Sequence, residues 1–190
     1  MNHSCQLTVA AKNYLTEFYN ILDTMIKEMT EAELTDSITH NFIVQMIPHH
    51  RAAIDMSYNL LEYSVWEPLR RIASQIIAEQ TKSIADMEEL LASGGCRRNS
   101  EQELRLYQRK MDQIMKTMFS DMNKACSSNE IDADFMREMI PHHKGAVEMS
   151  CNALQFPIAS GLIPILEAII ASQEKGIRQM DALLCRLGRK

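Results

Sequence analysis

The amino-acid sequence predicts an all-α fold, an antiparallel helical bundle built from two gap-free three-helix repeats. The first observation is an internal repeat, because adding 93 to a residue number carries residues 14–91 onto residues 107–184 with 29 identities in 78 positions. The second is the spacing of apolar residues, which recur every three to four positions in each copy. The third is the lack of the alternating patterns that strands show. We expect a single domain, residues 1–190, whose copies pack about a pseudo-twofold axis.

Three helices are expected in the first copy. Residues 7–30 carry apolar side chains at helical spacing. Thr35 or Asp36 is suited to cap a second helix, which continues to about Tyr63. A third helix is expected from about Glu67 to Leu91, with Gln80 among the residues of its apolar face.

The second copy repeats this scheme after a short connection. Residues 93–99, SGGCRRN, form the predicted linker, because paired glycines end a helix and the polar residues suit an exposed turn. Pro157 and Pro164 bracket the expected break between the last two helices.

Composition and charge exclude several classes of partner. A formal charge of −5 and a pI near 5.7 leave no basic surplus to meet phosphates, so we expect no nucleic-acid partner. No apolar run approaches the length of a membrane span. The N-terminal residues show no basic start followed by an apolar stretch, so no signal peptide is visible and a cytoplasmic location is expected on this ground alone.

Adjacent histidines in a duplicated motif are the most informative feature. Four of the six histidines occur as His-His pairs, in MIPHHRAAIDMS from residue 46 and MIPHHKGAVEMS from residue 139. On a helix the two imidazoles and the two flanking methionines of each motif fall within an arc of roughly 120°. The first motif offers Met46, His49, His50 and Met56, and the second offers Met139, His142, His143 and Met149. The proline before each pair is expected to kink its helix or to start a new one.

Methionines recur at fixed places outside these motifs. Of 14 methionines, ten occupy equivalent positions in both copies, and we call these the repeat-paired methionines. Besides the four in the motifs they are Met25, Met29, Met87, Met118, Met122 and Met180. A core needs apolar volume, but it does not need a thioether at the same five places twice. Met111 and Met115 correspond to Phe18 and Leu22, and they are expected to be ordinary core residues.

Two interpretations of these motifs remain open. Methionine at helical spacing often serves packing alone, and a buried histidine often only donates a hydrogen bond to a carbonyl. Two adjacent histidines in duplicate are harder to bury without a purpose, because each brings a donor and an acceptor that must be satisfied. Since imidazole is the commonest metal ligand, the pattern also predicts a metal site that draws on the four paired histidines and the ten repeat-paired methionines.

The residues that accompany the imidazoles favour copper(I) as the metal. A ferritin-type di-iron site uses Glu-x-x-His spacing, which this sequence lacks, and Asp55 and Glu148 are expected to face solvent or a neighbouring helix. A structural zinc site would use cysteines at recurring spacing. The five cysteines form no C-x-x-C pair and are odd in number, which favours free thiols. Thioether with imidazole suits Cu(I), and the similarly soft Ag(I) should compete.

The sequence also resembles a known family. FIVQMIPHHRAAIDMS and FMREMIPHHKGAVEMS, followed by IIAEQTKSIADMEELL and IIASQEKGIRQMDALL, are similar to the motifs of the domain of unknown function 305 (DUF305) family. The resemblance covers most of both copies. It implies a ferritin-like helical bundle and, for some members, copper binding in the bacterial envelope linked to copper tolerance. By position, the residues that carry over are the two His-His pairs and the methionines that flank them. The location is left open between envelope and cytoplasm.

Three functions are compatible with the sequence. The first is a Cu(I)-binding protein for sequestration, tolerance or handover, with a metal ion as its partner. The second is a metal-dependent redox enzyme, for which no nucleophile, base or cofactor loop can be identified. The third is a metal-free helical interaction module. Each of the three functions is compatible with a homo-oligomer. Because imidazole must be neutral to bind metal and has an unperturbed pKa of ~6.5, Cu(I) affinity is expected to fall from about pH 7 to about pH 5.

Overall fold

The described part of the chain, residues 6–125 and 127–188 of a computed structural model, contains six helices and no strand. They are α1 (Val9–Thr30), α2 (Ile38–Tyr63), α3 (Glu67–Ala92), α4 (Glu101–Asn123), α5 (Ile131–Ala153) and α6 (Leu162–Leu187). The predicted all-α class is confirmed. Each helix of the first copy has a counterpart in the second copy whose bounds match within three residues after the shift of 93.

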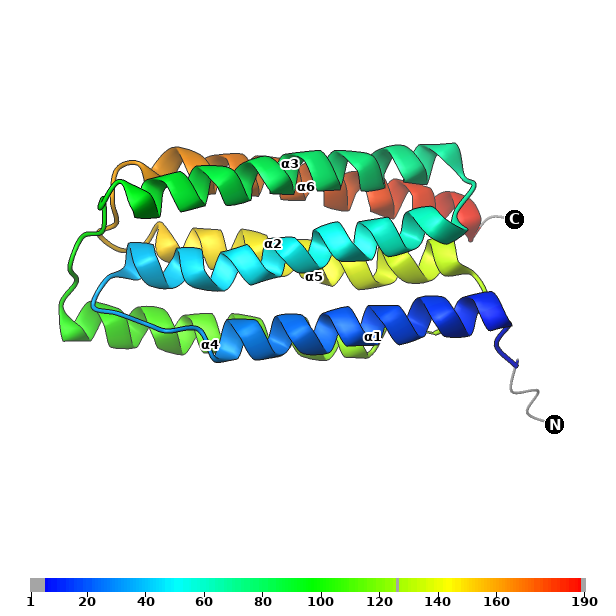
Figure 1. Cartoon of the computed structure of the whole chain (residues 1–190), viewed down its shortest axis with the longest axis horizontal. Coiled ribbons are helices and arrows are strands. Elements are labelled where there is room, and N and C mark those ends of the chain that lie inside the picture. Colours follow the sequence, from blue (N-terminus) through cyan, green and yellow to red (C-terminus); the bar gives the residue numbers. More distant parts are fainter. Residues whose placement is uncertain (1–5, 126, 189–190) are drawn as a thin grey trace.

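The helices form three stacked pairs, with α2 and α5 in the middle (Figure 1). α3 and α6 lie on one side of this middle pair, and α1 and α4 lie on the other side. Close contacts join α2 to α3, α3 to α6, α6 to α5 and α5 to α2, so these four helices form a closed ring. α1 packs on α2, and α4 packs on α5. α2 and α5 run in opposite directions and pack against each other.

Local signals set most of the helix ends. Thr8 caps α1 by accepting a hydrogen bond from the Ala11 amide, and Ser100 forms a capping box with Glu103 at the start of α4. The cap expected at Thr35 or Asp36 was wrong by one or two residues, because Ser37 caps α2. Thr35 instead donates its amide N–H to Asn41 Oδ1 at 2.7 Å.

Both internal prolines lie within continuous helices. Pro48 lies inside α2 and Pro141 inside α5, so neither proline starts a new helix. Pro157 lies in the connection between α5 and α6, and α5 ends at Ala153, earlier than the equivalent end of α2. A residue that precedes proline is disfavoured in the α conformation, which is consistent with this early end.

The connection between the two copies begins at a glycine turn and ends at a hydrogen-bonded asparagine. Gly94 has φ 71°, the left-handed conformation that ends α3 as the paired glycines predicted. Asn99 donates its amide N–H to the Asp36 carbonyl at 2.8 Å, and its Oδ1 accepts from the Ile38 amide at 3.0 Å. Its side-chain amide also donates to the Pro157 carbonyl at 2.8 Å. This one side chain therefore links the start of α2 to the α5–α6 connection.

One apolar core extends through the described helices. It includes the buried aromatic rings of Phe18, Phe42 and Phe135 and thirteen of the methionines. None of the described helices is long and apolar enough to cross a membrane.

Candidate metal centre

The two His-His pairs meet where α2 crosses α5. His49 Nε2 lies 3.2 Å from the His142 carbonyl oxygen, and His142 Nε2 lies 3.0 Å from the His49 carbonyl oxygen. The two rings stack, with centroids 3.6 Å apart and planes inclined at 29°. The copies thus exchange the same contact about the pseudo-twofold axis, and the sequence-predicted pairs are brought together at the centre of the molecule.

These contacts fix the tautomer of two of the rings. A carbonyl oxygen only accepts hydrogen bonds, so Nε2 carries the proton in both His49 and His142. In a neutral ring Nδ1 then holds a lone pair. Nδ1 is buried without a hydrogen-bond partner in His49 and His142, and the same is true of His50 and His143. Within the two His-His pairs four imidazole nitrogens therefore lack a partner, which is uncommon for buried polar groups.

The outer histidines of the two pairs have different surroundings. His50 Nε2 lies 3.0 Å from the Ser83 hydroxyl on α3. The residue equivalent to Ser83 is Gly176 on α6, and a Cβ built there would lie 2.8 Å from Cδ2 and 2.9 Å from Nε2 of His143. The main chain of α6 thus packs directly against the His143 ring, and the pseudo-twofold symmetry of the site is broken at this position.

Burial keeps all four rings neutral at ordinary pH. It lowers the pKa of His50 to about 3 and that of His142 to about 4, and the nearby His142 ring further lowers the pKa of His50. The pKa values of His49 and His143 are held well below the usual range, again mainly by burial. Neutral imidazole is the protonation state that binds metal ions.

All ten repeat-paired methionines lie in the buried core, each at most 3% exposed. Burial does not set them apart, because Met111, Met115 and Met136 are equally buried and have no methionine counterpart. No three His, Cys, Asp or Glu side chains of the described residues converge into a group that could hold a metal ion. A metal site at the His-His pairs would therefore need thioether ligands.

The thiols lie apart from this centre as far as they are described. Cys96, Cys151 and Cys185 are free and exposed. Cys5 and Cys126 lie outside the described residues.

Comparison with known proteins places the chain in a family. The model of the family described as a domain of unknown function, DUF305, matches residues 39–184, from the first turn of α2 to the last turns of α6. The chain belongs to the DUF305 family. The crystal structure of a DUF305 fragment from Deinococcus radiodurans is similar, with a TM-score of 0.58 and 25% identity over 78% of this DUF305 chain and 96% of the fragment. No match was found among curated proteins.

A pair of surface pockets repeats with the same period in this DUF305 chain. The first lies between α1 and α2, and Met25, Pro48 and Asp55 are among its lining residues. All eight residues that line the second, between α4 and α5, are equivalent to residues of the first, including Met118, Pro141 and Glu148. Asp55 and Glu148 are exposed at these pockets, as the sequence predicted. The pockets themselves were missed, because their residues combine two separate helices of each copy.

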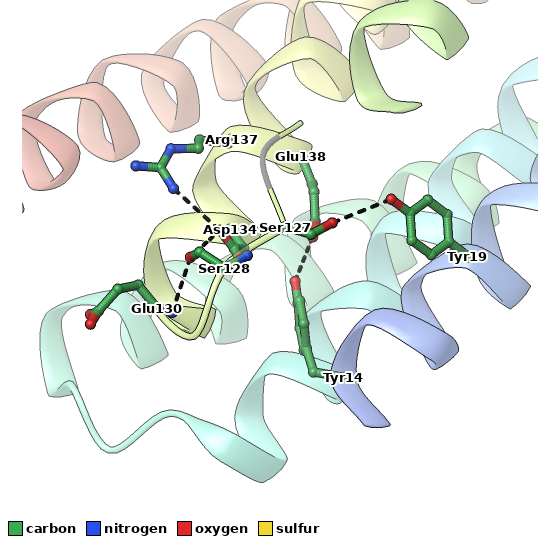
Figure 2. Close-up of polar contacts among 8 residues, drawn as sticks. All are labelled: Tyr14, Tyr19, Ser127, Ser128, Glu130, Asp134, Arg137 and Glu138. Carbon is green, nitrogen blue, oxygen red and sulfur yellow. Dashed lines mark hydrogen bonds and ion pairs between the residues drawn. The ribbon is translucent and has the colours of Figure 1, made fainter. Parts of the chain in front are cut away.

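A buried carboxyl group was also missed. Tyr14 on α1 donates its hydroxyl to Glu138 on α5 at 2.6 Å, and Figure 2 shows the two side chains pointing toward each other across the copies. Burial raises the pKa of Glu138 to about 8, against the opposing effect of the Tyr14 hydrogen bond. The equivalent pair is Tyr107 and Gln45, in which the Tyr107 hydroxyl and Gln45 Oε1 have no partner. The sequence signal was Glu138 itself, a charged residue on the buried face of its helix, where the other copy has Gln45.

Proposed function

We propose that this DUF305 protein binds a soft metal ion, Cu(I) before others, at the crossing of α2 and α5, for sequestration, tolerance or handover. The observation that carries the proposal is the set of four buried Nδ1 atoms without partners in His49, His50, His142 and His143. Leaving a buried acceptor unpartnered costs roughly 1–3 kcal/mol, so the Nδ1 lone pairs of His49 and His142 favour an occupant that accepts them.

The chemistry of the surrounding side chains supports a soft cation. Met46 and Met56 lie on the same helix face as the first pair, and Met139 and Met149 on that of the second. A thioether has no proton to lose, so these side chains would hold Cu(I) at any ordinary pH, and the neutral rings need not release a proton. Bound Cu(I) would supply no acid–base group; its role in this proposal is that of cargo.

One contact favours the metal-free interaction module instead. The crossed Nε2–carbonyl hydrogen bonds join α2 to α5 without any metal, so the inner histidines already have a structural role. A module whose histidines only hold the helices together would bind no metal, and binding measurements separate the two functions.

The test is anaerobic titration with Cu(I) against a chromophoric chelator, with the mass of the intact protein measured after gel filtration. Wild type is expected to retain Cu(I), and Ag(I) should displace it. A variant with Met46→Leu and Met139→Leu should bind at least tenfold more weakly. The matched control carries Met111→Leu and Met115→Leu, which are equally buried but not repeat-paired, and it should bind as wild type does. Equal loss in both variants, or no retained metal in wild type, would contradict the proposal.

A further inference from the structure

A cavity of about 200 Å³ lies between α3 and α6, and His50 forms part of its lining. Ser83, the hydrogen-bond partner of His50, also lines it. Ile165 and Ile169 of α6 supply apolar wall, and the exposed Ala168 lies on the same helix. The cavity therefore extends from the solvent-exposed surface of the bundle to a ring of the candidate metal centre.

Two buried glutamines line this cavity without using their hydrogen-bonding groups. Gln80 on α3 and Gln173 on α6 are repeat counterparts, and each is only 2% exposed. Both amide atoms of Gln80 and Oε1 of Gln173 have no partner. Buried amides of this kind are satisfied by water wherever a polar cavity has room for it, and a cavity of this volume holds several molecules. The lining beside His50 thus carries polar groups and leaves room for water.

Charges around the cavity favour cations. Glu79 and Asp86 contribute two carboxylates, and Lys82 contributes one ammonium group that pairs with Asp86. The excess of negative charge raises the local concentration of positive ions. On the other side of the pseudo-twofold axis, Gly176 packs directly against His143 and leaves no space for even a methyl group between them.

We propose that this cavity is the port through which Cu(I) enters and leaves, with His50 as the first ring that the ion meets. The proposal rests on the proposed function. Gln80 and Gln173 supply polar groups along the passage, and Ser83 holds the His50 ring at its inner end. Exchange takes place on the His50 side, because the Gly176 contact closes the His143 side.

The test uses a bulky residue at the mouth. Ala168→Trp places an indole over the cavity, and Ala171→Trp places one at an exposed position of α6 outside the cavity lining. Stopped-flow mixing with Cu(I) measures uptake, and mixing of the loaded protein with excess chelator measures release. Ala168→Trp is expected to slow uptake and release by the same factor, tenfold or more, with the Kd within twofold of wild type. Ala171→Trp is expected to leave both rates unchanged.

Other outcomes separate the port from the metal site. If wild type takes up Cu(I) but Ala168→Trp leaves both rates within twofold, the port is wrong and the metal site stands. A changed Kd with an unchanged uptake rate would also overturn the port, since the cavity would then be part of the binding site. If wild type takes up no Cu(I), both proposals fail. Gln80→Leu removes the buried amide without adding bulk, and it should slow both rates in the same direction.

Discussion

His49 and His142 each donate a ring N–H to the main-chain carbonyl of the other, at 3.2 and 3.0 Å, while their rings stack 3.6 Å apart. The donors and acceptors belong to two residues only, and the contact crosses from one copy to the other. It therefore makes a local contribution to the stability of the α2–α5 contact that exists without any ligand.

The first prediction tests that contribution in metal-free protein. His49→Leu leaves the His142 carbonyl without its donor, and His142→Leu does the same to the His49 carbonyl. Each change is expected to lower the free energy of unfolding by roughly 1–3 kcal/mol. Because the rings touch, the double variant should depart from additivity by at least about 0.5 kcal/mol. Urea unfolding measures the free energy of unfolding of all three variants, and Met111→Leu is the buried control. Single variants whose free energy of unfolding lies within error of that control would contradict the prediction.

The second prediction concerns acid stability. Folding holds the pKa of His50 at about 3 and that of His142 at about 4, whereas an unfolded chain titrates near ~6.5. Between these values the unfolded chain binds protons that the folded chain does not, so the stability is complete above about pH 6.5 and is lost as the pH falls toward 4. The cost is of the order of 2 kcal/mol per histidine at pH 5.

Unfolding midpoints in urea at pH 7, 6 and 5 measure this loss in metal-free protein. His50→Gln should make the decline with falling pH less steep, because one group no longer titrates differently in the two states. A midpoint that stays constant from pH 7 to pH 5 would show that the rings titrate alike in the folded and unfolded protein, and it would contradict the prediction.

The third prediction concerns Glu138, whose pKa of about 8 in the folded protein lies above the ordinary value of a carboxyl group. A raised pKa means that the folded state keeps a proton that the unfolded state releases. The contribution of protonated Glu138 to the free energy of unfolding is therefore present at low pH and is lost as the pH rises through about 8. Glu138→Gln, which introduces the residue found at the equivalent Gln45, should raise the melting temperature more at pH 9 than at pH 6. Glu148→Gln, at an exposed position, is the control and should show no such difference.

The fourth prediction concerns the thiols. No cysteine has a cysteine at its equivalent position, and the three described cysteines are exposed. Replacing all five with serine is expected to leave the number of tightly bound Cu(I) ions unchanged, as counted by mass spectrometry of the intact protein. Loss of more than half of the bound metal would assign the site to the thiols. Cys151 is the most informative single variant, because it follows the second motif by one residue.

The helices were predictable because periodicity and the repeat both report on them. Gly94 ends α3 where the paired glycines required, and the bounds of the first-copy helices lie within about two residues of expectation. The cap of α2 was misplaced because three adjacent polar residues can each cap a helix, and the choice depends on Asn41, which engages Thr35.

The candidate site was only partly predictable. Helical spacing placed each His-His pair on one face, but the crossed hydrogen bonds depend on α2 pairing with α5, which no local pattern encodes. Gln80 was placed among the residues of an apolar face, and its recurrence as Gln173 was the overlooked signal of the cavity. Burial also shifts protonation of the rings below the interval from pH 7 to pH 5, so Cu(I) affinity should persist further into acid than the unperturbed pKa implied.

The reciprocity between His49 and His142 has a consequence for the residues that the two copies can carry. Contacts in which each partner gives what it receives are the mark of isologous interfaces, where two identical subunits meet across a rotation axis. Asn59 and Asn152 add a second matched feature, because each donates to a tyrosine carbonyl of its own copy, Tyr14 or Tyr107, at 3.0 and 3.2 Å. The two copies thus meet as the subunits of a homodimer do, and because they share one chain they can carry different residues at equivalent positions. Ser83 and Gly176, or Gln45 and Glu138, are differences that a true homodimer could never hold.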